Sequence, residues 1–576
     1  MTIPSRICRR ALGDDSALPA DLHPVLRRVF AARGAHDASA LDLSLLHLLR
    51  TDTLLDMERA VVLLSTALRL NQKIIFVGDF DADGATSCAL GVRALKACGA
   101  QQVEFLVPNR FEYGYGLTPP IVELARVRGA ELLVTVDNGI SSLEGVAAAK
   151  AAGMQVLVTD HHLPGATLPA ADAIVNPNSP GDPFASKALA GVGVIFYVML
   201  ALRTHLRDTG WFQSKEINEP NFADLLDLVA LGTVADVVPL DLNNRRLVAQ
   251  GLARIRGGRC QPGISALLKV AGRDPKRIHS SDLSFAVGPR LNAAGRLADM
   301  SLGIECLLAD DPRRCLAIAT ELDQLNRERR ALESEMKTQA LELLAARQWD
   351  DHTLAAGICL FDESWHQGII GVVAGRIKDL HHRPVIAFAP AGADEIKGSA
   401  RSVPGVHIRD LLDAIATEHP ELLNRFGGHA MAAGLSIRAT DFKRFRQVFE
   451  HTVATRVDPA LLAPVLHTDG ELVSEHMTLD LARQLLDAAP WGQAFPEPLF
   501  DGEFVIKELR LVGAAHLRLQ LVDAHGATFA AIAFNAIDAD WAVRGTRARI
   551  AYRLAVNDYQ VVASLQLVVE HGESVV

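Results

Sequence analysis

Three aspartates at alternate positions follow an apolar run early in the chain. Residues 74–77 (IIFV) have the pattern of a strand buried on both faces, and Asp79, Asp81 and Asp83 come soon after it. Crowded carboxylates repel one another unless a cation neutralises them, and hard oxygen ligands suit Mg²⁺ or Mn²⁺. The spacing therefore predicts a divalent-metal site, whereas an isolated D-x-D-x-D could equally be a solvated acidic turn.

Further polar residues stand where later strands are predicted to end. These strands alternate with helical segments, which indicates a parallel α/β sheet, and they span 103–107, 132–136, 156–159 and 173–175. Sites in such sheets lie beyond the carboxyl ends of the strands. Residues at those ends should therefore meet the three aspartates, and they include Asp137, Asp160, His161 and His162. Asp236, in LGTVADVVPL, adds a carboxylate that would be costly to bury unpaired.

Seven motifs in order carry a resemblance to a known family. GDFDADGATS, VPNRFEYGYGL, VTVDNGISS, VTDHH and GTVADVVPL together resemble the DHH phosphoesterase superfamily. GPRLNAAGR and FGGHAMAAGLSI are similar to its RecJ branch, the single-strand-specific 5′-to-3′ exodeoxyribonucleases. The resemblance extends from about residue 45 to the C-terminus. A single DHH tripeptide would carry little weight, but the ordered set is highly specific.

The resemblance implies a phosphodiesterase centre that holds two divalent cations, Mn²⁺ or Mg²⁺. Two bridged cations would supply a deprotonated water and neutralise the non-bridging phosphate oxygens. His161 would favour Mn²⁺, because imidazole nitrogen is a softer donor. His162 would face the phosphate, and Asp160 would orient a histidine. The implied ligands are Asp79, Asp81, Asp83, Asp137, His161 and Asp236, with Asp137 as the bridge.

Two further motifs, residues 287–296 and the VPNRFEYGYGL segment that contains Arg110, are predicted to bind the substrate. Residues 287–296 (VGPRLNAAGR) have the pattern of a glycine-punctuated loop, which could be a simple turn or could present Arg290, Asn292 and Arg296 to phosphate oxygens. By resemblance, Arg110 and Arg296 would hold the scissile or neighbouring phosphates.

A second polar cluster is predicted about 100 residues further on. It contains Ser399, Arg401, Gly427, Gly428 and His429. Arginine and glycine amides suit a terminal phosphate dianion, which the resemblance makes the 5′-phosphate. The alternative is a glycine-rich turn beside a structural arginine.

The element pattern predicts an α/β protein of several parts. We expect an N-terminal helical segment, a parallel-sheet DHH catalytic domain, a connecting helix, an α/β DHH-associated domain and an OB-like barrel that binds single strands. The expected bounds are 1–45, 46–310, 311–350, 351–456 and 460–576. In the barrel, Lys507, Arg510, Arg518 and Arg553 could bind DNA or form a solvated face.

The composition is that of a soluble globular protein. Charged residues make up 22% and hydrophobic residues 49%, which makes disorder improbable. No segment has the pattern of a secretory signal or a membrane span. Seven cysteines without a C-x-x-C pair indicate reduced thiols, hence the cytoplasm, and argue against structural zinc. The net charge of −10 requires that any DNA path be a local basic stripe.

We therefore predict a single-strand-specific 5′-to-3′ exodeoxyribonuclease that releases mononucleotides in DNA recombination and repair. The resemblance implies single-stranded DNA, a single-strand-binding protein and a helicase as partners. Two alternatives stay open. A small-substrate DHH phosphoesterase would cleave pyrophosphate, oligonucleotides or cyclic dinucleotides, but it would need no barrel. An inactive DNA-binding scaffold should have lost several of the acids, which are all present here.

Overall fold

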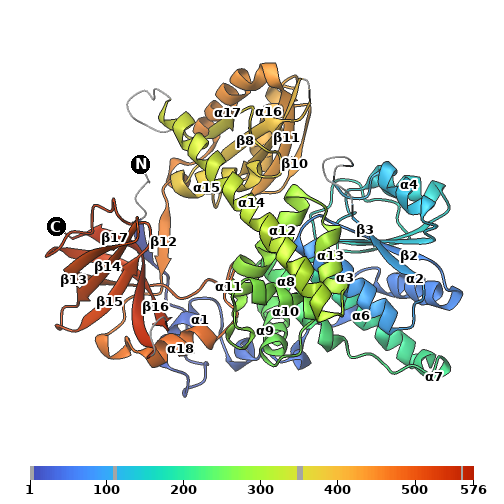
Figure 1. Cartoon of the computed structure of the whole chain (residues 1–576), viewed down its shortest axis with the longest axis horizontal. Helices are drawn as coiled ribbons and strands as arrows, with labels where there is room; N and C mark the ends of the chain where they lie inside the picture. The colour runs from blue at the N-terminus through green and yellow to red at the C-terminus, as the bar shows by residue number, and fades with distance from the viewer. Residues whose placement is uncertain are drawn as a thin grey trace.

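The chain folds into three bodies around one long helix. The computed structural model describes residues 6–107, 113, 115–346, 355–392, 394–558 and 562–575. Figure 1 shows an α/β body with an added helical half on the right, a second α/β lobe above it and a β-barrel on the left. The predicted fold class, with its parallel sheet, connecting helix and C-terminal barrel, is confirmed.

The first sheet contains five parallel strands in the order β3-β2-β4-β5-β6. Every residue of the neighbouring strands β2 and β4 is buried, as their continuous apolar runs predict. The strands are β2 (Ile74–Gly78), β3 (Val103–Leu106), β4 (Leu132–Val136), β5 (Gln155–Thr159) and β6 (Ala173–Val175). The accompanying helices are α2 (Met57–Leu70), α3 (Ala82–Ala97), α4 (Pro119–Val127), α5 (Leu143–Ala151) and α6 (Gly191–Asp208).

A helical half completes this body. It consists of α7 (Trp211–Ser214), α8 (Leu226–Ala235), α9 (Leu242–Arg256), α10 (Pro262–Val270), α11 (Ser280–Asp282), the π-helical turn η6 (Leu283–Val287), α12 (Gly288–Leu297) and α13 (Ser301–Leu308). Its ten-residue α8 buries every residue but its last, Ala235, and packs on α3. Among the described helices, none combines the length and the hydrophobicity that crossing a membrane requires.

The expectation of a loop at 287–296 is wrong, because these residues form helix α12. Pro289 stands in the first turn, where proline favours a helix start. Gly295 lies inside the helix, where a Cβ would come within 1.8 Å of the Phe80 carbonyl oxygen. The glycine therefore serves close packing against the aspartate-bearing segment rather than a bend.

Helix α14 (Pro312–Ala345) connects the first body to the second lobe. Asp311 caps it by accepting a hydrogen bond from the Arg313 N–H. Ile318 and Leu322 at one end belong to the core of the first body, whereas Met336 and Ala340 at the other end pack in the second lobe. Each end of the helix is thus buried in a different core, which fixes the two bodies relative to each other.

The second lobe is a mixed five-stranded sheet with helices. Its strand order is β10-β11-β9-β8-β7, and only β7 and β8 are parallel. Edge strand β10 (RFGG) lies where the sequence suggested a glycine-rich turn. The strands are β7 (Ile358–Phe361), β8 (Val385–Pro390), β9 (Glu395–Arg401), β10 (Arg425–Gly428) and β11 (Ala432–Arg438), and the helices are α15 (Ile370–His381), α16 (Ile408–Glu418) and α17 (Phe442–Arg456).

The C-terminal body is a closed barrel in the order β13-β14-β15-β17-β16. All neighbours are antiparallel except β15 and β17, which pair in parallel and close the barrel. It consists of β13 (Phe500–Val512), β14 (His516–Val522), β15 (Thr528–Ala533), β16 (Arg547–Asn557) and β17 (Ser564–Ser574), preceded by α18 (Leu479–Asp487). The closed five-stranded barrel agrees with the OB-like barrel that the sequence predicts.

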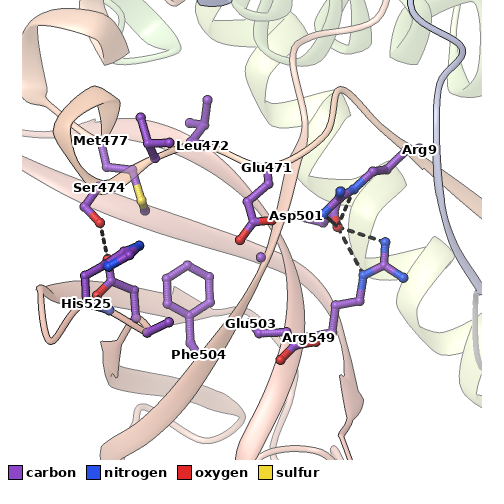
Figure 2. A pocket seen from close by; sticks show the side chains of 14 residues that line it. Arg9, Glu471, Leu472, Ser474, Met477, Asp501, Glu503, Phe504, His525 and Arg549 are labelled. Carbon is purple, nitrogen blue, oxygen red and sulfur yellow. Dashed lines mark hydrogen bonds and ion pairs between the residues drawn. The ribbon is translucent and has the colours of Figure 1, made fainter.

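The N-terminal segment joins the barrel instead of forming a purely helical extension. Besides α1 (Pro24–Ala31), it contains β1 (Arg6–Arg9), which pairs in parallel with β12 (Val465–Thr468). Figure 2 shows the side chains of Arg9 and Arg549 bonded to Asp501, whose side chain is fully buried, at distances down to 2.9 and 2.8 Å. Thr468 also donates to Asp501. This clamp joins the first and last parts of the chain.

Short 3-10 helices occupy several of the connections. They are η1 (Ala38–Leu41), η2 (Leu45–His47), η3 (Thr51–Thr53), η4 (Phe222–Leu225), η5 (Pro275–Arg277), η8 (Ala439–Asp441), η9 (Pro459–Leu462) and η10 (Ser474–His476). Arg246 on α9 donates to the carbonyls of Asp42 and His47, so the segment before α2 is held against the helical half. This segment is therefore a packed part of the first body.

Candidate metal centre and substrate cleft

The strand-end acids and histidine gather at one edge of the first sheet. Their ligand atoms form three groups in which all atoms lie within 4.8 Å of one another: Asp79, Asp81 and Asp137; Asp83, His161 and Asp236; and Asp137, His161 and His162. His161 Nε2 lies 3.0 Å from Asp137 Oδ1 and 3.6 Å from Asp236 Oδ2. Asp137 belongs to two of the groups, which is the arrangement that a bridging ligand needs.

Local backbone geometry fixes the first aspartates. Asp81 caps α3 by accepting from the N–H groups of Asp83 and Gly84. Both oxygens of Asp83 accept from the start of α6, at 2.6 Å from the Gly191 nitrogen and 2.9 Å from that of Val192. Gly191 is required there, because a Cβ would come within 2.6 Å of the Asp137 Cβ. Two helix N-termini thus position the carboxylates and partly compensate their charge.

The donor set fits a pair of divalent cations. In the described part of the chain, Asp137 Oδ1 and His161 Nε2 are buried and make no hydrogen bond. Burial and the charge of Asp81 raise the pKa of Asp83 to about 7. Burial and neighbouring carboxylates, Asp83 first, also raise the pKa values of Asp137 and Asp236 well above the usual range. Buried acids that repel one another in this way are stabilised by a cation.

The two histidines differ in charge state and surroundings. Burial and the positive charge of His162 lower the pKa of His161 to about 4, which keeps its imidazole neutral and able to bind a metal. Burial disfavours charge on His162 too, but the hydrogen bond and charge of Asp160 raise its pKa to about 9. Asp160 Oδ1 lies 2.7 Å from His162 Nδ1 and also accepts from the backbone N–H groups of both histidines. Asp160 therefore orients the pair.

A cavity in the second lobe adjoins this centre. It measures about 370 Å³, and its lining includes Arg296 from α12 together with Lys397, Ser399, Arg401 and Arg425. Arg401 donates to Ser399 Oγ at 3.0 Å, and a Cβ on Gly371 would come within 2.8 Å of both side chains. Arg296 follows Gly295, which packs on the carbonyl between Asp79 and Asp81. The cavity is thus basic. One of its lining residues, Arg296, directly follows the glycine that packs against the segment carrying Asp79 and Asp81.

Comparison with known proteins agrees with this geometry. Three family models match: the DHH family N-terminal domain at residues 73–233, the DHHA1 domain at 351–455 and the RecJ OB domain at 468–571. The single-stranded-DNA-specific exonucleases RecJ of Salmonella typhimurium and Escherichia coli are each 52% identical to this chain, and the alignments cover 98% of both sequences. The chain belongs to the RecJ family.

Solved structures of the RecJ family extend the match to the whole fold. The crystal structure of RecJ in complex with Mn²⁺ from Thermus thermophilus has a TM-score of 0.80 at 29% identity, covering 100% of this chain and 80% of that one. The corresponding Mg²⁺ complex has a TM-score of 0.75 at 27% identity, covering 100% of this chain and 79% of that one. Both metals that the donor set suits have therefore been found in complex with a RecJ protein.

Not every predicted substrate residue of this RecJ family member reaches the cleft. Arg290 is buried and pairs with Asp323 of α14 at 2.7 Å, so the expectation that it binds phosphate is wrong. Asn292 accepts from the Ala82 N–H at 2.7 Å and so supports the start of α3. Both differences follow from the helix at 288–297, which turns these side chains toward neighbouring helices. Arg110 lies outside the described residues.

The glycine pair and its histidine lie on an edge of the second lobe. Gly427 and Gly428 belong to β10, opposite Gly434 and Ala433, and they are not among the residues that line the Arg401 cavity. His429 follows them, and burial together with the charges of His162 and Arg401 lowers its pKa.

Several residues that support the centre were given no role at the sequence level. Asn138 donates to the carbonyls of Val77 and Val136, which ties the ends of β2 and β4 together. Asn176 and Asn178 donate to the carbonyls of His162 and His161. Their position at strand ends was the available signal. Tyr115 makes edge contacts with Phe80 and His162, and no spacing pattern pointed to it.

The barrel carries a basic site of its own. Arg510 on β13 and Arg518 on β14 are directly opposite each other and line a cavity of about 450 Å³. Like charges in register destabilise a sheet unless an anion neutralises them. Glu508 Oε2, in the wall of the same cavity, lies 3.8 Å from the Arg510 guanidinium and partly compensates it, whereas Arg553 pairs with both Glu497 and Glu570.

Proposed function

We propose that this protein is a single-strand-specific 5′-to-3′ exodeoxyribonuclease that releases mononucleotides in DNA recombination and repair. The cluster of mutually repelling carboxylates beside a basic cavity carries the proposal. The first provides ligands for two divalent cations, Mn²⁺ or Mg²⁺, and the second suits a phosphate. The relatives named as single-stranded-DNA-specific exonucleases support the substrate class.

The residues of the cluster divide the work of phosphodiester hydrolysis. Asp79, Asp81, Asp83, Asp137, His161 and Asp236 would hold the cations. When bound, these ions would lower the pKa of a water and neutralise charge on the phosphate oxygens. Asp160 fixes His162 through Nδ1, which leaves Nε2 to donate a proton to the leaving oxygen or to stabilise developing charge. Asn176 and Asn178 hold the backbone of both histidines in place.

Polarity requires a pocket that recognises one end of the strand. We assign this role to Ser399 and Arg401, together with Arg296, which lines the same cavity, and His429. An arginine with several donors binds a terminal phosphate dianion better than a bridging monoanion. The strand would then be cut from its 5′-phosphate. The amides of Gly427 and Gly428 could contribute from the edge strand, although they lie outside the cavity wall.

The polarity is tested with strands labelled at one end. Label at the 5′ end should be released first as mononucleotide, and release should be slower from 5′-hydroxyl strands. Arg401→Ala should reduce the preference for 5′-phosphate more than it lowers kcat on saturating substrate. Val127→Ala, on the exposed end of α4, is the matched surface control. Mononucleotides that appear first from the 3′ end would contradict the assignment.

The barrel and the cellular partners complete the proposal. Arg510 and Arg518 would bind the backbone of the strand at a distance from the cleavage site. The complete set of metal ligands argues against an inactive scaffold, and the barrel argues against a small-substrate phosphoesterase. We also propose a cytoplasmic location and, from the family resemblance, a helicase and a single-strand-binding protein as partners. Co-purification of the chain with each partner at physiological salt tests the last point.

A further inference from the structure

A strained valine and an exposed phenylalanine lie close to the metal centre. Val237 directly follows Asp236 and has a φ of +62°, a conformation that β-branched residues very rarely adopt. Its side chain is 57% exposed, and that of Phe285, on the π-helical turn, is 75% exposed. Both residues line one cavity of about 440 Å³. We call this pair of residues the Phe285 platform.

The cavity lies between the first body and the segment that leads to the barrel. Its far wall contains Trp491 and Gln493. Leu240, in the same loop as Val237, donates to the Gln493 carbonyl at 2.8 Å, and Ser280 donates to the Trp491 carbonyl at 2.6 Å. Figure 1 places α11, directly before the π-helical turn, on the side of the first body that faces the barrel. The platform is therefore situated between the cleavage site and the barrel.

The platform is held at a fixed place relative to the cations. Ser284 Oγ donates to the Val234 carbonyl at 2.9 Å, which ties the π-helical turn to the last turn of α8. Asp236 is the C-cap of the same helix. A π-helical turn and a positive φ are both costly features that concentrate at functional sites. Here they aim an aromatic ring and a branched side chain into one cavity from two tethered segments.

The chemistry of the wall suits a nucleobase. Valines 234, 237 and 238 and Leu240 supply an apolar surface, and the hydroxyls of Ser281 and Ser284 supply polar groups. The two cavity arginines are already engaged, Arg256 near Asp487 and Arg553 with Glu497. Aromatic faces next to a modest number of hydrogen-bonding groups bind bases of any sequence by stacking. A phosphate would find no unengaged guanidinium among these described residues.

We propose that the Phe285 platform stacks on one nucleobase of the strand being cut, on the side of the cleavage site that faces the barrel. This inference rests on the proposed function and adds a positioning element to it. The platform is tethered to the helix that carries Asp236. It therefore stacks on the base of the nucleotide at one fixed position relative to the scissile bond. It thereby keeps the strand in register after each mononucleotide is released.

Kinetics on strands with a single abasic site test the platform. A series of 5′-phosphorylated strands carries the missing base at successive positions, and KM and kcat are measured for each. For the wild-type protein KM should rise at one position only. Phe285→Ala should raise KM on the intact strand about 5- to 150-fold and leave kcat unchanged. On the abasic strands, KM of this variant should no longer depend on the position of the missing base. Phe285→Trp should restore both the low KM and the position dependence.

Two controls separate the outcomes. Val127→Ala, a truncation of another exposed apolar side chain, should leave the abasic profile unchanged. Melting temperatures of all variants should agree, because Phe285 is exposed. If the wild-type protein cuts single strands but the abasic penalty persists in Phe285→Ala, the platform is wrong and the proposed function stands. If the wild-type protein cuts no single strand, both are rejected.

Discussion

The carboxylates at the edge of the first sheet and the carboxylate of Asp501 beside the barrel have opposite electrostatic surroundings. At the edge of the first sheet, burial and mutual repulsion raise the pKa values of Asp83, Asp137 and Asp236. Among the described residues, no arginine or lysine lies within ion-pair distance of these three. At the junction with the barrel, Asp501 is as buried as Asp83 and Asp137 but accepts from Arg9, Arg549 and Thr468 (Figure 2).

The difference separates a structural carboxylate from a functional one. Burial alone would raise the pKa of Asp501, but hydrogen bonds from Arg9, Thr468 and Arg549 outweigh it and hold the pKa below the usual range. Its charge is therefore compensated by the chain itself. The sheet-edge acids have no arginine or lysine partner among the described residues, so their ionised forms repel one another, which raises their pKa values and suits a place where a cation is to be bound.

Asp137→Asn should give the largest effect of any single change in either group. Hydrolysis of single strands should fall about 1000-fold or more, because the cations are worth several kcal/mol in the transition state. The metal-free protein should melt at an equal or higher temperature, because repulsion with Asp83 and Asp81 is removed. Initial rates and calorimetric melting measure the two effects. A lower melting temperature of the metal-free variant would place Asp137 among the structural carboxylates.

Asp160→Asn should give a smaller loss that is confined to rate. We expect hydrolysis at saturating Mn²⁺ to fall about 10- to 100-fold, because the partner that orients His162 is weakened while the ligands remain. Single-turnover rates and Mn²⁺ affinity, measured on the same preparation, check this. In a protein that already carries His162→Ala, adding Asp160→Asn should lower the rate little further. If Asp160→Asn abolished Mn²⁺ binding, Asp160 would be a ligand rather than a positioning residue.

Asp501→Asn should affect stability and leave the chemistry intact. Loss of this carboxylate leaves Arg9 and Arg549 without their shared acceptor, which should cost about 1 to 3 kcal/mol of unfolding free energy. The cost stays below that of a fully buried pair, because both arginines are partly exposed. Denaturant unfolding and kcat on short strands are the measurements. A large drop in kcat with unchanged stability would overturn the distinction.

The smallest expected effect is a dependence of barrel stability on pH. Because the pKa of Asp501 is lowered in the folded protein, its contribution is present above the unfolded value of about 3.9 and is lost as the pH falls through the folded value. Acid unfolding of the wild-type protein, followed by fluorescence, should therefore be steeper below about pH 4 than that of Asp501→Asn. If the two proteins lost stability identically below about pH 4, the contribution of the clamp to stability would not depend on the charge of Asp501.

The sequence predicted the metal cluster better than its surroundings, for a physical reason. Parallel strands end at a common edge, so Asp79, Asp137 and His161 could be expected to meet from chain order alone. The role of a glycine was harder to predict. Gly295 suggested a bend in the chain, but in the structure it permits close packing against Phe80. Which of these roles a glycine has depends on the segment that packs against it. The β1–β12 pair joins residues more than 450 positions apart, which no local pattern reveals.

Partners of buried charges were equally hidden from the sequence. Arg290 stands in a motif that suits phosphate, yet its acceptor Asp323 lies on a helix that starts 22 residues later. Asp501 has no motif around it, and its two arginines come from opposite ends of the chain. Charge compensation depends on tertiary contacts, so residue type and spacing alone could not separate the structural acids from the functional ones.

Titration of the metal-free protein with Mn²⁺ tests the central claim most directly. Calorimetry on the wild-type protein, Asp137→Asn and Asp501→Asn compares one carboxylate from each group under the same conditions. We predict that the wild-type protein and Asp501→Asn bind two equivalents of Mn²⁺ with similar affinity, and that Asp137→Asn loses at least one of them. Unchanged Mn²⁺ binding by Asp137→Asn, or its loss in Asp501→Asn, would contradict the account.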